Sequence, residues 1–188
     1  MISLIISHEE CHIKTLYLIR HAKSSWKNGN QWDFLRGLNK RGMHDLETMS
    51  SYMALRKIKP DLILSSCALR AQLTADGLAE KIRYSNRIHY MDELYLTRPE
   101  MALNVLSTQE DQYDSLFFIG HNPTLTELVN TLIKDKFTKF PTLGIFALKL
   151  DIDSWEEIGE VDDAEVDFFI FPKQFKYYMP KQIRTILA

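Results

Sequence analysis

The sequence predicts a single α/β domain: a three-layer α/β/α sandwich, with a mostly parallel sheet and helices on both faces. Short β-branched or aromatic runs alternate with segments of helical periodicity, and this alternation is typical of a parallel sheet covered by helices. The 188 residues suit one domain, and the chain contains no internal repeat, low-complexity tract or linker. We expect the domain over residues 14–172, with 1–13 and 173–188 as terminal appendages.

The expected strands are apolar, β-branched or aromatic runs bounded by turn residues. They are Thr15–Arg20, Asp61–Ser66, Arg87–Met91, Ser115–Gly120, 144–151 and 164–171. The last two are expected to run antiparallel, with turn residues and the segment SWEEI between them.

The expected helices have apolar residues at intervals of three and four, or begin close to a proline. They span 38–58, 68–82, 99–109 and 124–133. Because ligands of such sheets bind beyond the carboxyl ends of the strands, the residues that follow each strand are the candidates for function.

Composition argues against several classes of protein. The formal net charge of −2 provides no overall basic field for nucleic acid. Two cysteines are too few for a disulfide framework, so we expect a reduced, cytoplasmic protein. No apolar run approaches the ~20 residues of a membrane span. We therefore expect neither nucleic acid nor membrane as a partner, and the sequence leaves the oligomeric state open.

Polar residues gather where three of the expected strands end, in the segments IRHAKSSW, SSCALRA and GHNP. The candidates there are Arg20, His21, Lys23, Ser24, Arg70 and His121. The ends of parallel strands meet at one edge of the sheet, so two imidazoles and two guanidiniums should lie side by side.

Such a group of side chains suits a phosphoryl group. Guanidinium is permanently charged and its fork matches phosphate oxygens. Imidazole can attack when it is neutral, and it can form a covalent intermediate. The chain contains no Walker-type loop, so nucleoside triphosphate chemistry has no support.

Four longer segments carry these residues: LYLIRHAKSSW, LNKRG, LILSSCALRAQLTA and FFIGHNPTLTELV. In order and spacing they resemble the histidine phosphatase superfamily, and within it the SixA-type phosphohistidine phosphatases. The resemblance covers the chain from Thr15 to Phe171 and implies a phosphoglycerate mutase-like fold. It also implies catalysis without a metal or other cofactor.

The resemblance also implies roles for individual residues. His21 matches the phosphoacceptor, while Arg20, Arg70 and His121 match residues that bind the phosphoryl group. Glu93 matches the position of a carboxylate that donates a proton in many members.

Several alternatives stay open at this stage. Asp92 could be the proton donor instead of Glu93, or both could be solvated loop charges. Lys23 and Ser24 could contact phosphate or could only face solvent. Trp26 and Trp32 could line the pocket or anchor the loop that contains them.

The segment HEECH, His8–His12, has the spacing of a zinc-protease motif, but that motif needs a helix and a third ligand. We expect it to be a solvated tail without metal.

Together these observations predict a metal-independent phosphatase that works through a phosphohistidine intermediate. The expected substrate is phosphohistidine in proteins, because the chain has little room for a large lid over the site. One alternative is a phosphatase acting on a small sugar or nucleoside phosphate. A non-catalytic phosphate-binding module is another, and a mutase is less favoured because it would need more covering structure.

Overall fold

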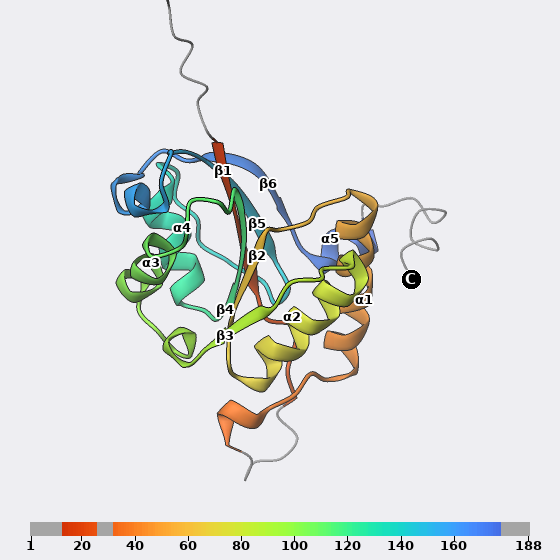
Figure 1. The fold of residues 1–188 in the computed structure, drawn as a ribbon. Helices are drawn as coiled ribbons and strands as arrows, with labels where there is room; N and C mark the ends of the chain where they lie inside the picture. Colours follow the sequence, from red (N-terminus) through yellow and green to blue (C-terminus); the bar gives the residue numbers. More distant parts are fainter. Residues whose placement is uncertain (1–12, 26–31, 178–188) are drawn as a thin grey trace, which may run out of the picture.

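The computed structural model describes residues 13–25 and 32–177 as a six-stranded sheet between two layers of helices (Figure 1). The strands are β1 (Ile13–Arg20), β2 (Leu62–Ser66), β3 (Ile88–Met91), β4 (Ser115–Gly120), β5 (Ile145–Asp151) and β6 (Glu165–Ile170). The α-helices are α1 (Lys40–Leu55), α2 (Leu69–Ile82), α3 (Pro99–Ser107), α4 (Thr124–Leu132) and α5 (Pro172–Tyr177). Short 3-10 helices form η1 (Asp33–Leu35), η2 (Asp92–Leu94) and η3 (Trp155–Glu160).

The strand order β3-β2-β4-β1-β5-β6 confirms the predicted fold class. Strands β1 to β4 pair in parallel, whereas β5 and β6 pair antiparallel, as expected for the last two. Because β2, β4 and β1 are neighbours, their carboxyl ends lie side by side. The loops after these three strands therefore meet at one edge of the sheet.

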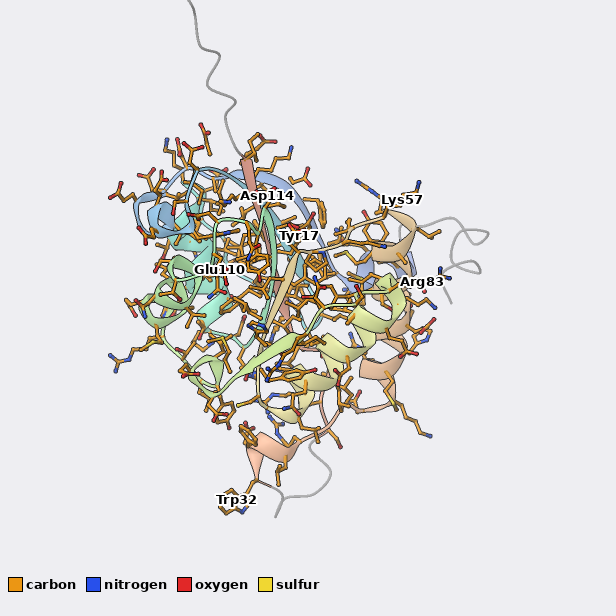
Figure 2. All side chains as sticks on the ribbon, in the orientation of Figure 1. Tyr17, Trp32, Lys57, Arg83, Glu110 and Asp114 are labelled. Atoms are coloured by element: carbon orange, nitrogen blue, oxygen red, sulfur yellow. The ribbon has the colours of Figure 1, made fainter. Side chains whose placement is uncertain are left out.

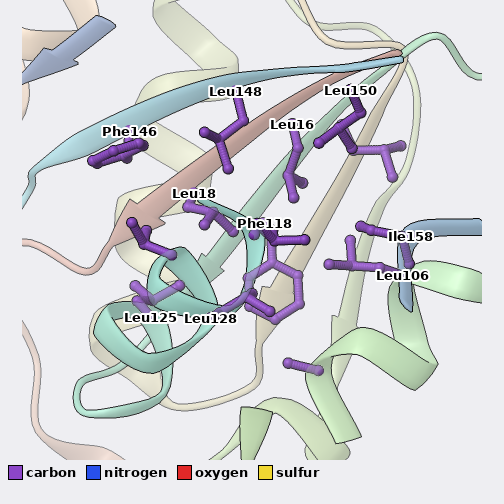
Figure 3. Packing of buried hydrophobic residues seen from close by; sticks show 14 of the residues in the cluster. Leu16, Leu18, Leu106, Phe118, Leu125, Leu128, Phe146, Leu148, Leu150 and Ile158 are labelled. Atoms are coloured by element: carbon purple, nitrogen blue, oxygen red, sulfur yellow. The ribbon is translucent and has the colours of Figure 1, made fainter. Parts of the chain in front are cut away.

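The two helical layers cover opposite faces of the sheet (Figure 1). Helices α3 and α4, together with η3, bury Leu16, Leu18 and Phe118 (Figure 3). Helices α1, α2 and α5 cover the other face, where Ile19 and Phe117 are buried. Successive residues of a strand point to opposite faces, so β1 contributes to both cores. Each fully buried aliphatic or aromatic side chain of this size stabilises the fold by about 1.5–3 kcal/mol.

Two regions differ from the sequence prediction. The segment SWEEI forms part of η3, whose capping box begins at Ser154 and whose first residue, Trp155, is fully buried. Residues 173–177, expected in the C-terminal appendage, belong to α5, where Phe175 is buried with its ring edge-on to Tyr52. Phe175 thus packs this short helix against α1.

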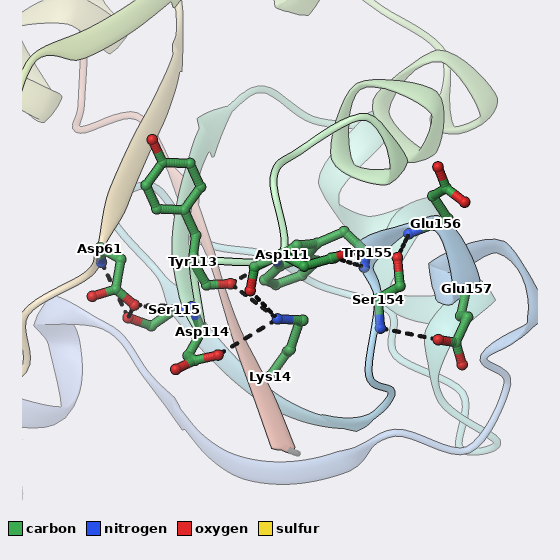
Figure 4. Close-up of polar contacts among 10 residues, drawn as sticks. All are labelled: Lys14, Asp61, Asp111, Tyr113, Asp114, Ser115, Ser154, Trp155, Glu156 and Glu157. Atoms are coloured by element: carbon green, nitrogen blue, oxygen red, sulfur yellow. Dashed lines mark hydrogen bonds and ion pairs between the residues drawn. The ribbon is translucent and has the colours of Figure 1, made fainter.

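A polar cluster lies near the start of β1, at the end of the sheet opposite the loops that follow β1, β2 and β4 (Figure 4). The buried Lys14 ammonium donates hydrogen bonds to the carbonyl oxygens of Asp111 (2.9 Å) and Tyr113 (3.3 Å). The indole of Trp155 donates to the same Tyr113 oxygen at 2.7 Å. These bonds join β1, the loop before β4 and η3, and so fix the far end of the strand that leads to His21.

No helix in the described part of the chain combines the length and the apolar character needed to cross a bilayer.

Candidate active site

Two imidazoles and a guanidinium meet where β1, β2 and β4 end. The backbone amide of His21 donates to the Gly120 carbonyl at 3.1 Å, which continues the pairing of β1 with β4. The ring centroids of His21 and His121 are 5.1 Å apart. Nε of Arg70 lies 3.3 Å from Nε2 of His21. The structure therefore brings together residues that the sequence places 100 positions apart, counted from His21 to His121.

The hydrogen bonds of His21 determine its tautomer. Its Nδ1 lies 2.7 Å from the carbonyl oxygen of Ala22. A carbonyl only accepts, so Nδ1 carries the proton in this contact. The neutral ring then presents the lone pair of Nε2 toward Arg70, and Nε2 is the atom able to attack.

The loop that carries His21 is fixed from both sides. The Ala22 amide donates to Oγ1 of Thr74 at 3.0 Å, and the Asn39 amide donates to the Lys23 carbonyl at 3.0 Å. Asn39 also caps α1 by accepting from the Gly42 amide. A Cβ at Gly42 would lie 2.1 Å from the Lys23 carbonyl oxygen, so only glycine permits this approach. The segment LNKRG thus holds the loop in place through Asn39 and Gly42.

His121 is held by a serine from the neighbouring strand. Its Nε2 lies 2.9 Å from Oγ of Ser66, which also accepts from the Ala68 amide. When the Ser66 hydroxyl donates its proton to Nε2, the proton of the neutral imidazole sits on Nδ1. That Nδ1 is buried and has no hydrogen-bond partner among the described residues.

Arg20 offers a second buried donor. One of its terminal nitrogens donates to the Phe140 carbonyl at 2.6 Å, while its Nε is buried without a partner in the described part of the chain. Buried polar groups normally have hydrogen-bond partners. Nε of Arg20 is therefore one donor that a phosphoryl oxygen could satisfy, and Nδ1 of His121 is a second when Ser66 donates to Nε2.

Burial keeps both histidines neutral at physiological pH. Desolvation, assisted by the nearby His121 and Arg70 and opposed by the hydrogen bond to Ala22, lowers the pKa of His21 to about 3. Desolvation, followed by the charge of Arg70, lowers the pKa of His121 to about 4. A neutral His21 is the form that can act as a nucleophile.

Comparison with known proteins identifies the family of this chain. A model of the histidine phosphatase superfamily (branch 1) matches residues 16–95. A structure from Agrobacterium tumefaciens, described as a phosphohistidine phosphatase SixA, is 30% identical to this chain with a TM-score of 0.72. The similarity covers 84% of this chain and 97% of that one. The chain belongs to the histidine phosphatase superfamily.

Two further relatives extend the comparison. A structure of the protein histidine phosphatase SixA complexed with tungstate has a TM-score of 0.74 and 19% identity, covering 85% of this chain and 98% of that one. A protein of uncharacterized function from Mycobacterium tuberculosis is 27% identical over 164 residues, which is 81% of this chain and 99% of the relative. These similarities confirm the predicted phosphoglycerate mutase-like fold class and the SixA-type resemblance.

The remaining candidate residues lie less centrally. Ser24 is buried, and its carbonyl oxygen accepts from the Asn39 side chain, while the Lys23 carbonyl accepts from the Asn39 amide. Both residues thus stabilise the loop through hydrogen bonds to their backbone carbonyl oxygens. Binding of phosphate by their side chains stays a prediction.

Glu93 and Asp92 are both exposed on η2, at the margin of the site. Within the described residues, neither forms a hydrogen bond or ion pair with His21 or Arg70. Burial, followed by a hydrogen bond to Asp92, raises the pKa of the Cys67 thiol to about 11, so this cysteine is protonated at neutral pH. Asp92 thus lies near Cys67, and the assignment of the proton donor to Glu93 stays a prediction.

The sequence interpretation missed a carboxylate of the candidate site. Asp33, on η1, accepts from Arg70 at 3.0 Å and from the Tyr95 hydroxyl at 2.8 Å, and it pairs with Arg36 at 2.5 Å. Trp32 beside it is 81% exposed and projects from the molecule (Figure 2), so its side chain lines no pocket formed by the described residues. Trp26 and His8–His12 lie outside the described residues. The only sequence signal for Asp33 was its place three residues before Arg36.

The lowered pKa values of the two histidines predict how the stability of the fold depends on pH. As pH falls below the ordinary histidine value of 6.5, the unfolded chain binds protons that buried His21 and His121 do not yet accept. The free energy of unfolding should therefore fall between pH 6.5 and about 4, by up to about 1.4 kcal/mol per pH unit for each histidine.

Urea unfolding across that pH range measures the slope. His121→Asn should flatten it, whereas substitution of exposed His89 should leave it unchanged. Equal slopes in wild type and His121→Asn would show that His121 is not kept neutral by the fold.

Proposed function

We propose that this chain is a phosphatase that works through a phosphohistidine at His21, and that its substrates are phosphohistidine side chains of proteins. One observation carries the first part. Nε2 of His21 is the unprotonated ring nitrogen, and it faces Arg70 beside two buried nitrogens that have no hydrogen-bond partner among the described residues. Membership in the histidine phosphatase superfamily supports phosphatase activity.

The reaction follows from this arrangement in two displacements. Nε2 of His21 attacks phosphorus, the bond from phosphorus to the leaving group breaks, and Arg20, Arg70 and His121 stabilise the charge on the phosphoryl oxygens. Water then attacks phosphorus, the bond to Nε2 breaks, and inorganic phosphate leaves. His21 returns to its neutral form, with its proton on Nδ1 held by the Ala22 carbonyl.

The leaving group favours phosphohistidine as substrate. The imidazole of a phosphohistidine can carry a proton on its far nitrogen, so it departs neutral without a donor. This agrees with the exposed position of Glu93, which forms no hydrogen bond to the site within the described residues. The exposed Trp32, next to Asp33, also offers an apolar contact for a protein surface.

A small phosphate ester is the second candidate. Its alkoxide leaving group needs a proton, and Glu93 at the margin of the site could supply one. A module that only binds phosphate is less consistent with the site, because binding needs no unprotonated nitrogen beside a charged donor.

A substrate panel distinguishes these functions. We expect a higher kcat/KM for a phosphohistidine-containing protein than for free phosphoimidazole, sugar phosphates or nucleoside monophosphates. Trp32→Ala should raise KM for the protein about tenfold, as for loss of an aromatic anchor, and should leave free phosphoimidazole nearly unaffected.

Leu55→Ala is the matched control, since Leu55 is also largely exposed but lies at the far end of α1. A clear preference for a small ester would favour the second candidate. An equal effect of Trp32→Ala on both substrates would rule out a docking role for Trp32.

Removal of metal ions should leave activity intact. The proposed chemistry uses the positive side chains of Arg20 and Arg70 where many phosphatases use cations. Turnover should therefore persist after dialysis against EDTA, and His8→Ala should have no effect. Loss of activity that zinc restores would instead support the zinc interpretation of His8–His12.

A further inference from the structure

The donor groups of Arg70 are divided between two partners. Its two terminal nitrogens donate to Asp33, one to the backbone oxygen at 2.8 Å and the other to Oδ2 at 3.0 Å. Its Nε donates to Nε2 of His21 at 3.3 Å. Arg70 is only 3% exposed, so water cannot replace these partners freely. Asp33 thus binds the two terminal nitrogens of the guanidinium, while Nε of Arg70 faces Nε2 of His21.

Asp33 is itself held from several directions. The Tyr95 hydroxyl donates to the same Oδ2 at 2.8 Å, and Arg36 pairs with the other oxygen. The Tyr95 ring stands edge-on to the rings of Phe34 and His121. Partial burial alone would raise the pKa of Asp33, but the Tyr95 hydrogen bond and the charges of Arg70 and Arg36 outweigh it and lower the pKa. The carboxylate therefore stays ionised at neutral pH and keeps accepting these bonds.

These contacts admit two opposite roles for Asp33. It could compete with phosphate for the guanidinium, or it could orient the guanidinium toward phosphate. The phosphoryl group bonds to Nε2 of His21, which lies on the Nε side of Arg70. Asp33 occupies the terminal nitrogens instead, and each of these retains a second N–H. A phosphoryl oxygen can therefore reach Arg70 without displacing Asp33.

We infer that Asp33, held by Tyr95, is a positioning residue that orients Arg70 toward the phosphoryl group on His21. This role rests on the proposed function, because it takes His21 as the phosphoryl acceptor. Arginine has a long side chain with several rotatable bonds, and a misplacement of about 1 Å can cost as much as 10² in rate. The two bonds from Arg70 to Asp33 remove that freedom before substrate arrives.

The test uses Asp33→Asn and Tyr95→Phe, with Asp163→Asn as the control. Asp163 is also a carboxylate in an ion pair, with Lys134, but it lies in the loop between η3 and β6. We expect Asp33→Asn to lower kcat/KM by roughly 10–10², Tyr95→Phe to lower it less, and the control to match wild type. Folding of each variant is checked by its Tm.

A double-mutant cycle separates positioning from a direct role. In an Arg70→Ala background, Asp33→Asn should change kcat/KM by less than about twofold, because the residue on which it acts is gone. Multiplicative losses in the double mutant would overturn the inference, since Asp33 would then act independently of Arg70.

Binding of inorganic phosphate, measured by calorimetry, gives a second readout. The change in phosphate affinity on Asp33→Asn has opposite signs for a competing and for a positioning role. Removing a negative charge should strengthen phosphate binding if Asp33 is a competitor. We expect weaker binding in Asp33→Asn, because Arg70 loses its orientation, and stronger binding would overturn the inference. Phosphate binding needs no turnover, so failure to find phosphate on His21 would refute the proposed function while leaving this result readable.

Discussion

Replacing His21 by alanine should abolish turnover, with a loss in kcat of roughly 10⁴–10⁶, the range seen when a covalent nucleophile is removed. The effect should be this large because the other nucleophilic groups nearby are disabled. The Cys67 thiol is protonated at neutral pH, and His121 is bonded through Nε2 to Ser66. Folding should survive, since His21 lies at the end of β1 rather than inside either hydrophobic core.

The intermediate can be located by rapid quenching under alkaline conditions, which preserves phosphohistidine, followed by mass spectrometry. We expect phosphate on His21, and NMR should place it on Nε2, because Nδ1 donates to the Ala22 carbonyl. His89→Ala, at an exposed position on β3, is the control and should retain full activity. Phosphate on Nδ1 or on another residue would contradict the mechanism.

Replacing Glu93 by glutamine should affect two substrates very differently. An alkyl phosphate releases a basic alkoxide, and a positioned general acid contributes about 10²–10⁴ to such a step. Phosphohistidine releases a neutral imidazole and needs no donor. We therefore expect Glu93→Gln to lower kcat/KM strongly for an alkyl phosphate and only slightly for a phosphohistidine protein.

The matched control is Asp92→Asn, which alters the neighbouring exposed carboxylate on the same short helix. It should reduce neither activity. Equal losses on both substrates in Glu93→Gln would show that Glu93 is not the donor. A large loss on phosphohistidine alone would contradict the argument from the leaving group.

The sequence predicted the strands and the central site for the same physical reason. Parallel strands read as short apolar runs, and their carboxyl ends must meet, so Arg20, His21, Arg70 and His121 could be placed together without coordinates. The segment LNKRG was identified as a motif, but the close approach of Gly42 to the loop of His21 depends on packing that no local pattern encodes.

Other features of the structure produce little or no pattern in the local sequence. Asp33 and Tyr95 reach the site from two loops separated by 62 positions, and such a contact has no periodicity to reveal it. The buried Phe175 and Trp155 anchor short helices whose lengths are too small for an amphipathic pattern. The exposure of Glu93 depends on how η2 packs, which no local pattern reveals, and its role as proton donor stays a prediction.

The missing side chain at Gly42 has a consequence for the dynamics of the catalytic loop. Because helix α1 rests directly on the Lys23 carbonyl, the loop around His21 can open only if the first turn of that helix opens with it. The amides of Asn39 and Gly42 should then exchange with deuterium together, at a rate set by opening of the helix rather than by fluctuation of the loop. Gly42→Ala would uncouple the loop around His21 from the first turn of α1. The loop would then populate several conformations, and substrate would bind only the one with the site correctly formed.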